Sequence, residues 1–354
     1  MVRPAPSDSR RRGRAGMPVF LLAAALLAGC GGAGAATGPH TAAQPAAAAV
    51  PADTPTPEPT PTPTPRPDAL RDPVVVQVEN SPDARPQRGL AEASILYEYS
   101  AEGGISRFSA VYFHVPSGQV GPVRSARIAT ILLSGFYDAV LVYSGASDYI
   151  EARLAQSGVR HYNEDTAFGD LFRIGSRYPP HNLYTDGRHM GDLLARVGDP
   201  VASYALWPRP APEAPLPPSL PVHTVSVPIS PFEQPVFTWT PAAGGFLRTE
   251  PRTGPLVDAG TGAPLVVPTL VVLQVPVRPA PEVVDVNGVM GLDHELLGSG
   301  PAQVFTGGLA YTATWQQDPH GPPRLLLPDG TPAPIAAGEV AVELVPTGSP
   351  AVVR

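Results

Sequence analysis

The sequence contains no lysine, so all 24 of its basic side chains are arginines. Mechanisms that use a lysine base or a lysine Schiff base are therefore excluded. Cys30 is the only cysteine. Once that thiol is modified, the chain has no disulfide, no thiolate metal ligand and no cysteine nucleophile. Because the chain uses arginine at every strongly basic position, the presence of arginine instead of lysine at a given position carries no information about function.

The chain also has little positive charge. Its formal net charge is −7, and without residues 1–29, which carry five arginines and one aspartate, it becomes about −11. Nonspecific nucleic-acid binding relies on a basic surface. We therefore expect no nucleic acid among the partners.

The first thirty residues have the layout of an export signal. Arginines cluster within residues 10–14, and the apolar run at residues 20–27 is too short to span a bilayer comfortably. The sequence LAGC at residues 27–30 follows and resembles the lipobox of bacterial lipoproteins. That resemblance implies cleavage before Cys30 and acylation of this cysteine, which would tether the chain to membrane lipid outside the cytoplasm. No other stretch is long and apolar enough to cross a membrane.

Composition then divides the chain. Alternating proline and threonine after the cysteine predict an extended stalk, and a second proline-dense stretch separates two longer segments of single-domain length. The predicted parts are a signal peptide (1–29), a lipidated cysteine with its stalk (30–69), an N-terminal domain (70–206), a linker (207–220) and a C-terminal domain (221–354).

Apolar periodicity predicts the fold class. The first segment interleaves strand and helix patterns, which indicates an α/β (α+β) sandwich with a mixed sheet. The second segment has short Val/Leu/Thr runs broken by proline and glycine, which indicates a small, mostly antiparallel β domain. The strands expected in the first segment cover residues 74–78, 95–99, 107–115, 120–123 and 139–143, with helices at residues 128–136 and 148–156.

Polar residues of the first segment gather at strand ends, where α/β sheets usually bind ligands. Four such segments, residues 79–86, 98–108, 121–127 and 179–184, in this order resemble the YerB-like bacterial lipoproteins. The motifs EGGISRF and GPVRSAR carry most of the resemblance, which continues less sharply through the second segment. It implies a lipoprotein architecture and a domain of unknown function, with no established reaction.

The GPVRSAR motif also has its own chemistry. Arg124 and Arg127 lie three residues apart as the chain enters an expected helix, and Ser125 lies where helix-capping oxygens and free amides collect. Two guanidinium groups beside a helix N-terminus suit a phosphate, a pyrophosphate or a carboxylate, and Arg107 on the adjacent strand could be a third donor. In the alternative interpretation these arginines pair with nearby carboxylates, namely Glu79, Glu98, Glu102 or Asp138.

His181 is the other candidate, because in PPHNLY two prolines make the backbone rigid just before a titratable ring. A lone histidine is, however, more often structural. A Ser125–His181–Glu98 triad is disfavoured because no GxSxG pattern surrounds the serine. No histidine or acidic spacing indicates a metal site, and no cofactor is expected. The candidate ligand-binding residues are Arg85, Glu98, Glu102, Arg107, Arg124, Ser125, Arg127, His181 and Asn182.

The order of strand, turn and arginines also resembles the LytR-CpsA-Psr phosphotransferases, which bind polyprenyl pyrophosphate. In that resemblance Arg107, Arg124 and Arg127 would face the pyrophosphate. Phe108 and Ser109, however, stand where an acidic metal ligand is expected, which puts catalysis in doubt more than binding. Three functions remain open: a noncatalytic module that recognises an anionic envelope glycan or polyprenyl phosphate, a phosphotransferase or hydrolase acting on that ligand, and a protein-binding scaffold or regulator.

Overall fold

The structure is a computed structural model that describes residues 69–198, 206–207, 217–283 and 288–354. Every described residue belongs to one compact unit. Cys30, the export signal and the stalk lie outside the described residues. Within the described part, no helix has the length and apolar character needed to cross a membrane.

The first segment interleaves strands and helices, as its apolar pattern predicts. Its elements are β1 (Ala69–Glu79), β2 (Ile95–Ser100), β3 (Ser106–His114), β4 (Gln119–Val120), α1 (Ile128–Phe136), β5 (Val140–Val142), α2 (Asp148–Ser157), β6 (His161–Tyr162), β7 (Phe172–Arg173), β8 (Leu183–Asp186) and α3 (Gly187–Arg196), with 3₁₀ turns η1 (Pro82–Ala84), η2 (Leu90–Glu92) and η3 (Glu102–Gly104).

The second segment is built from strands and one 3₁₀ turn in its described residues. Its elements are β9 (Leu220–Pro221), β10 (Thr224–Ser226), β11 (Val236–Thr240), η4 (Pro241–Ala243), β12 (Gly245–Glu250), β13 (Gly254–Pro255), β14 (Val266–Val267), β15 (Thr269–Val275), β16 (Val277–Val283), β17 (Met290–His294), β18 (Gly298–Thr306), β19 (Leu309–Gln317), β20 (Arg324–Leu326), β21 (Val340–Pro346) and β22 (Val352–Val353).

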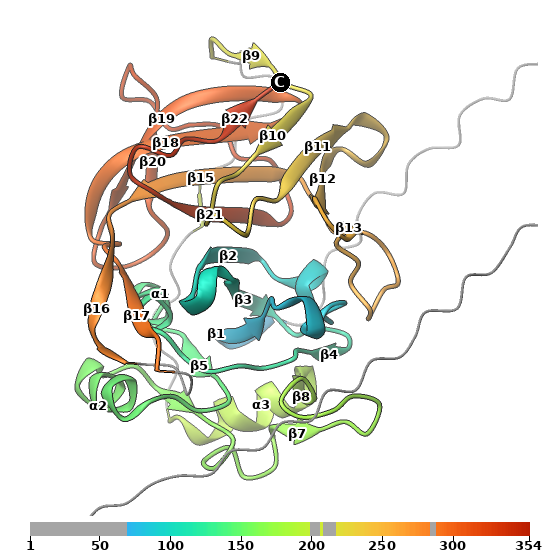
Figure 1. The fold of residues 1–354 in the computed structure, drawn as a ribbon, viewed down its shortest axis with the longest axis vertical. Helices are drawn as coiled ribbons and strands as arrows, with labels where there is room; N and C mark the ends of the chain where they lie inside the picture. Colours follow the sequence, from blue (N-terminus) through green and yellow to red (C-terminus); the bar gives the residue numbers. More distant parts are fainter. Residues whose placement is uncertain (1–68, 199–205, 208–216, 284–287) are drawn as a thin grey trace, which may run out of the picture. The chain divides into compact units, whose positions relative to one another are not determined.

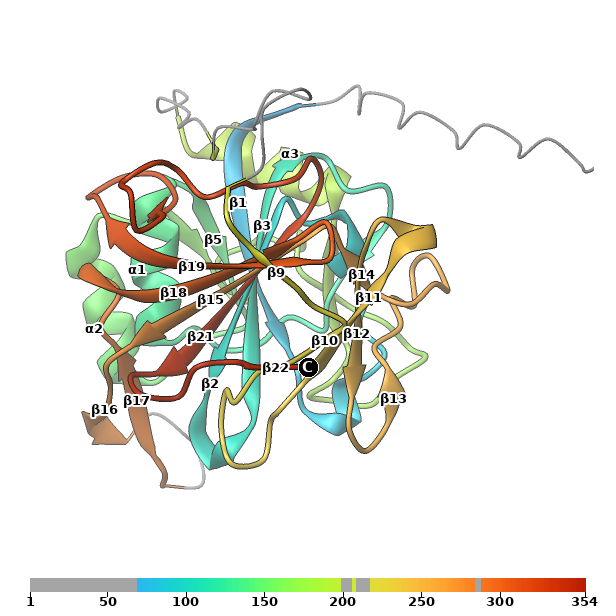
Figure 2. The same cartoon turned by 90° about the horizontal axis from the view of Figure 1, so that it is seen from above.

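One mixed sheet runs through both segments. Its strand order is β20-β19-β18-β15-β21-β2-β3-β1-β5-β6, with β9 paired to β19. The join is the parallel pair of β2 and β21, which extends from Ile95 opposite Val340 to Tyr99 opposite Leu344. Figure 2 shows these strands fanning across the molecule from the second segment into the first. The two segments are therefore held together by main-chain hydrogen bonds.

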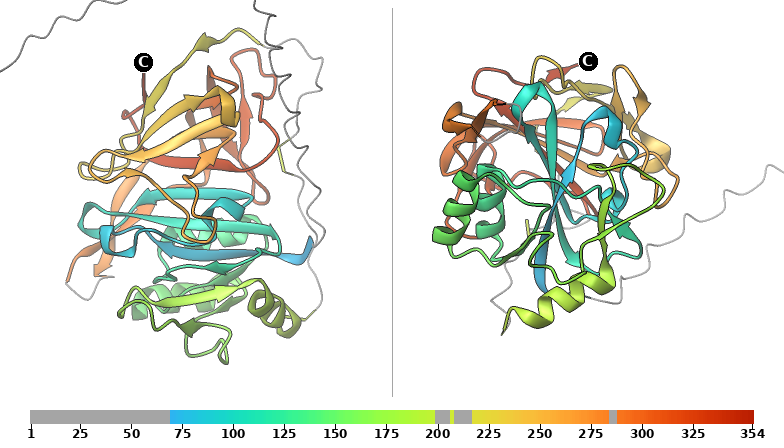
Figure 3. Two further views of the ribbon diagram at one scale, coloured as in Figure 1. Left: turned by 90° about the vertical axis from the view of Figure 1, so that its right-hand side faces the viewer. Right: turned by 60° about the horizontal axis from the view of Figure 1, so that its bottom comes forward.

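The faces of this sheet carry two apolar clusters. Helices α1 and α2 pack into the first cluster, whereas α3 and the separate sheet of β10, β11, β12, β13, β14 and β22 contribute to the second. Figure 1 shows α2 and α3 at the end of the unit opposite β18 and β19, with α1 between them and beside β17, and Figure 3 shows the same unit from two other sides. Each cluster contains residues from both segments.

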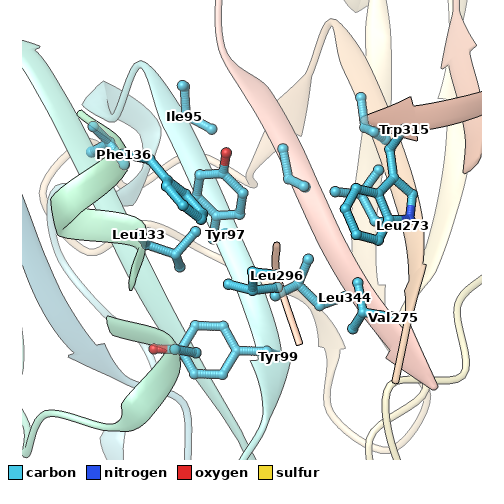
Figure 4. Close-up of a cluster of buried hydrophobic side chains, with 14 of the residues drawn as sticks. Ile95, Tyr97, Tyr99, Leu133, Phe136, Leu273, Val275, Leu296, Trp315 and Leu344 are labelled. Atoms are coloured by element: carbon cyan, nitrogen blue, oxygen red, sulfur yellow. The ribbon is translucent and has the colours of Figure 1, made fainter. Parts of the chain in front are cut away.

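The first cluster shows how the segments share a core. Figure 4 shows Tyr97 and Phe136 of the first segment on one side, with Leu273, Leu344 and Trp315 of the second segment opposite. All five are at most 4% exposed. Burying large apolar side chains stabilises a fold by roughly 1.5–3 kcal/mol each, so this interface contributes to the stability of the whole unit.

The expected fold class is confirmed: a mixed α+β segment precedes a mostly antiparallel β segment. Two details differ. The strand expected at residues 120–123 is only Gln119–Val120, because Gly121 and Pro122 interrupt the ladder. Helix α3 was not predicted; Asp186 caps it by accepting a hydrogen bond from the His189 amide at 3.0 Å.

Candidate functional site

Several predicted residues meet at one edge of the mixed sheet, where β1 ends, β3 begins and α1 begins. Glu79, the last residue of β1, is the register partner of Arg107 in β3. The GPVRSAR loop crosses the same edge, because the Arg124 amide donates to the Gln77 carbonyl at 2.8 Å. We call the charged residues gathered here the arginine cluster: Glu79, Glu102, Arg107, Arg124, Arg127 and His181.

Arg107 is the most deeply buried base of the cluster, with 4% of its surface exposed. Its Nη1 donates to the Ser106 carbonyl at 3.1 Å, and its Nε has no hydrogen-bond partner among the described residues. Arg107 forms no ion pair within that part of the chain. Burial lowers the pKa of Arg107 to about 10. The positive charges of Arg127 and Arg124 also lower it, whereas the carboxylates of Glu79 and Glu102 raise it. The side chain remains charged at neutral pH; Glu79 and Glu102 attract it, but neither forms an ion pair with it among the described residues.

Arg124 and His181 share one carboxylate. Glu79 lies with Oε1 at 3.2 Å from Arg124 Nε and with Oε2 at 2.9 Å from His181 Nδ1. Glu79 is buried, whereas the side chains of Arg124 and His181 are 26% and 24% exposed. These two side chains are therefore the more exposed partners in the ion pairs of Glu79.

Arg127 lies at the start of α1. Its Nε is 2.6 Å from Glu102 Oε2, and its backbone amide donates to Thr130 Oγ1 at 3.0 Å. Arg127 is itself the N-cap residue of α1, so Ser125 lies two residues before the helix cap instead of at it. The carbonyl of Ser125 accepts a hydrogen bond from Arg127 Nη1 at 3.3 Å.

Asn182 does not join the cluster. Its Oδ1 accepts from Arg173 Nη1 at 2.7 Å, and its carbonyl accepts from the Ile174 amide. These contacts close the turn between β7 and β8. Asn182 therefore has a local structural role in this arrangement.

Arg85 and Glu98 belong to a second buried group, at the join of the two segments. Glu98 Oε2 accepts from Arg248 Nη2 at 2.6 Å, and Arg248 also pairs with Glu250. Arg85 Nη2 lies 2.8 Å from Glu233 Oε1. We call this group the seam network; its charged residues are Arg85, Glu98, Glu233, Arg248, Glu250 and Glu343.

The seam network has four carboxyl groups and two guanidinium groups, all of them largely buried. Burial raises the pKa of Glu233 to about 8, and the charge of Glu98 raises it too. Burial also raises the pKa of Glu343 well above its usual value. Burial opposes the ionisation of Glu250, but the Arg248 guanidinium brings the pKa of Glu250 below its ordinary value. Protons, as well as arginines, therefore balance the negative charge of the seam.

Asn80 connects the seam network to the arginine cluster. Its Nδ2 donates to Glu98 Oε1 at 2.8 Å and to Ser106 Oγ at 2.7 Å, while Arg85 Nε donates to its Oδ1 at 3.0 Å. Ser106 directly precedes Arg107 in β3, and Asn80 directly follows Glu79. The arginine cluster and the seam network are thus adjacent, and the candidate ligand-binding residues are divided between them.

Ser100 and His294 form a polar pair that the sequence did not indicate. Ser100 Oγ lies 3.0 Å from His294 Nε2, and burial lowers the pKa of His294 to about 4. Both residues are enclosed, and His294 Nδ1 has no partner among the described residues. The contact therefore lacks the acid that orients the histidine in a serine hydrolase triad.

Hollows of appreciable size lie elsewhere on the unit. One of about 510 Å³ is lined by residues such as Leu220 and Thr312, one of about 360 Å³ by Ile128 and Arg153, and one of about 300 Å³ by Trp207. None of these three hollows is lined by a residue of the arginine cluster. Among the described residues no group of three or more His, Cys, Asp or Glu side chains is arranged to hold a metal ion.

The two interpretations of the arginines both find support in these contacts. Arg124 and Arg127 pair with Glu79 and Glu102, as the carboxylate alternative expects. Arg107 leaves the cluster with one more guanidinium than carboxylate. Sequence reasoning missed Arg248, because an arginine alternating with apolar residues in a strand usually points to solvent; it is 1% exposed.

Comparison with known proteins identifies the family. The model described as "Protein of unknown function (DUF3048) N-terminal domain" matches residues 60–198, and the model of the corresponding C-terminal domain matches residues 225–342. The curated "Putative lipoprotein YerB" of Bacillus subtilis (strain 168) is 44% identical over 117 residues, which cover 32% of this chain and 35% of that protein. The chain thus matches about a third of this relative's length.

A solved structure supports the same relationship over a longer stretch. The crystal structure of YerB protein from Bacillus subtilis has a TM-score of 0.66 at 25% identity and covers 80% of this chain and 94% of that chain. Both halves of the unit, and their order, are therefore shared with a protein named as a lipoprotein. This chain belongs to the YerB-like family, whose N- and C-terminal DUF3048 domains have no assigned function.

Proposed function

We propose that this protein is a lipid-anchored, extracytoplasmic module that recognises a phosphate- or pyrophosphate-bearing ligand of the cell envelope through its arginine cluster. The anchor is the acylated Cys30, in line with the lipobox-like LAGC and with the named lipoprotein relative. The proline-rich stalk at residues 30–69 gives the folded unit reach from the lipid surface.

The observation that carries the proposal is the unpaired charge of Arg107. A buried guanidinium without a carboxylate is costly, since desolvation is not repaid by an ion pair. The cluster holds three arginines against Glu79 and Glu102, which also attract Arg107, so an added anion would neutralise a net excess of one positive charge. Guanidinium groups bind phosphate oxygens well because their N–H groups form a planar fork.

The ligand's approach follows from exposure. Arg124 and His181 are about one quarter exposed, so they are the groups that a phosphate can reach first. Arg107 and Arg127 lie behind them and act through their charge, which is strengthened by a low local dielectric. None of the hollows described above is lined by a residue of the cluster, so in this proposal the ligand binds at the surface.

A catalytic role has less support. A phosphotransferase needs a metal ion or a positioned base to activate its nucleophile. Phe108 and Ser109 follow Arg107 where an acidic ligand would stand, and the described residues supply no metal cluster. We therefore favour recognition without bond cleavage, with a phosphotransferase as the alternative and a protein-binding scaffold as a third function.

The proposal is tested by thermal unfolding of the full-length protein in detergent with added pyrophosphate. Pyrophosphate at 100 times its Kd should stabilise the fold by about 2.7 kcal/mol and raise the melting temperature measurably. Arg124→Ala should remove most of that rise, whereas Arg153→Ala, which removes an arginine stacked on Tyr149, should not. No rise in the wild type with pyrophosphate would exclude the proposed site.

A further inference from the structure

Two large aromatic side chains lie exposed on loops beside the arginine cluster. Tyr178 is 88% exposed and Phe232 is 67% exposed. Exposed rings of this size forgo the free energy of burial, so an exposed pair next to a charged site is an informative feature.

The turn that carries Phe232 is held in place by hydrogen bonds. Ser230 Oγ accepts from the amides of Phe232 and Glu233, at 3.2 and 3.0 Å, and donates to the Gly104 carbonyl at 2.5 Å. The ring lies against Gly104, where an added Cβ would overlap it. Gly104 closes the η3 turn, which also contains Glu102, the partner of Arg127.

The turn that carries Tyr178 is also held in place by hydrogen bonds. The Tyr178 carbonyl accepts from the His181 amide at 2.9 Å. The preceding Arg177 donates to the carbonyls of Ala84 and Pro86, at 2.6 and 2.9 Å. Tyr178 therefore belongs to the turn that presents His181 to the arginine cluster.

Both turns are fastened to the same loop, residues 80–86. Arg177 holds the carbonyls on either side of Arg85, and Arg85 itself binds Glu233, one residue after Phe232. This loop directly follows Glu79, which contacts Arg124 and His181. The turns that carry the two rings are thus bonded to the loop that follows Glu79, the residue that contacts Arg124 and His181.

We infer that Tyr178 and Phe232 form an aromatic rim that takes the sugar ring of a glycosyl phosphate whose phosphate binds the arginine cluster. The inference rests on the proposed function and specifies its ligand class. A pyranose ring has an apolar face of C–H groups that packs on an aromatic ring, while its hydroxyl groups stay in water. Tyrosine and phenylalanine provide rigid contact area at a small entropic cost.

Phe168 supplies a matched control. It is 76% exposed, comparable to the two rim residues, but its ring lies under the Arg196 guanidinium at 5.3 Å and its loop contacts α3 through Ala167 and Arg196. Its ring is therefore already engaged by a cation of its own chain. Phe168→Ala tests whether the loss of any exposed aromatic ring weakens binding.

The experiment compares two probes by calorimetric titration of the full-length protein in detergent: inorganic phosphate and N-acetylglucosamine 1-phosphate. The sugar phosphate should bind about tenfold more tightly than phosphate, the factor that corresponds to about 1.4 kcal/mol of ring contact. Tyr178→Ala and Phe232→Ala should each lower the affinity for the sugar phosphate about threefold or more, with the phosphate affinity unchanged. Phe168→Ala should alter neither affinity.

The outcomes separate this inference from the proposed function. Equal affinity for both probes, or a sugar preference that survives both rim substitutions, overturns the aromatic rim and leaves the phosphate site in place. Absence of binding by either probe overturns the rim and the proposed function together. A loss caused by Phe168→Ala as large as that of the rim variants also overturns it.

Discussion

Glu98 and Glu343 are direct partners where β2 pairs with β21, so two buried carboxyl groups lie side by side at the join of the two family segments. Arg248 compensates Glu98 at 2.6 Å, while burial first, and then the charge of Glu98, raises the pKa of Glu343 well above its usual value. The join therefore depends on two cross-segment arginines, Arg248 and Arg85, and on bound protons. Its stability should respond to pH and to the loss of Arg248.

The first prediction concerns pH and Glu233. In the unfolded chain this carboxyl titrates near its ordinary value, but in the folded protein burial raises the pKa of Glu233 to about 8. The folded state binds the proton more strongly, so this contribution is complete below about pH 4.5 and is lost as the pH rises towards 8. The melting temperature should therefore fall between pH 5 and pH 8.5.

The variant Glu233→Gln should show a smaller fall over the same pH range, because an amide cannot lose the proton. Glu164→Gln is the control, since Glu164 pairs with Arg173 at an exposed position. The prediction fails if the melting temperature of the wild type rises from pH 5 to pH 8.5 and the two variants show the same rise. That result would show that Glu233 holds no proton in the folded state.

The second prediction concerns Arg248, which is 1% exposed and binds Glu98 and Glu250. Arg248→Ala leaves both carboxylates buried without their cation, and breaking such a pair costs about 3–5 kcal/mol. Urea unfolding monitored by tryptophan fluorescence measures this loss. Adding Glu98→Gln to Arg248→Ala should recover part of it. A loss below about 1 kcal/mol would mean that the seam charges are solvated.

The third prediction concerns the shared sheet. Because β2 pairs with β21 and both apolar clusters draw on both segments, the unit should unfold in one calorimetric transition. Fragments 68–206 and 221–354, expressed separately, should each lack the cooperative transition of the whole. Two independent transitions, each reproduced by a fragment, would instead support autonomous domains at the boundaries expected from the sequence.

The fourth prediction concerns the anchor. Cys30→Ser removes the thiol that the lipobox resemblance marks for acylation. Since stable anchoring requires acyl chains, the variant should leave the membrane fraction after cell fractionation. Alanine at the neighbouring Gly31 is the control and should leave the partition unchanged. Retention of the Cys30→Ser variant in the membrane fraction would count against lipid anchoring.

Local patterns made much of the first segment predictable. Residues 74–78, 95–99 and 107–115 were expected as strands and lie in β1, β2 and β3, while the spacing from Ile128 to Phe136 correctly gave α1. Burial on both faces explains the continuous apolar run in β1. The structure brings Arg107, Arg124 and Arg127 near one another, and their role in ligand binding stays a prediction.

Long-range pairing was beyond the reach of sequence patterns. Nothing local to Glu98 shows that β21, more than 200 residues later, lies beside it, so the continuous sheet and the seam network were missed. Helix α3 had a readable signal in the apolar spacing of Met190, Leu193 and Leu194 after the Asp186 cap. Glu79 was named only as a pairing alternative, yet it joins Arg124 and His181.

The most direct test of the central claim is the affinity of Arg107→Met for pyrophosphate, measured by calorimetric titration together with the melting temperature. If the unpaired Arg107 charge serves an anion, its removal should leave the melting temperature unchanged or higher and weaken binding at least about tenfold. A lower melting temperature with unchanged pyrophosphate affinity would contradict the account, because Arg107 would then stabilise the fold and take no part in binding.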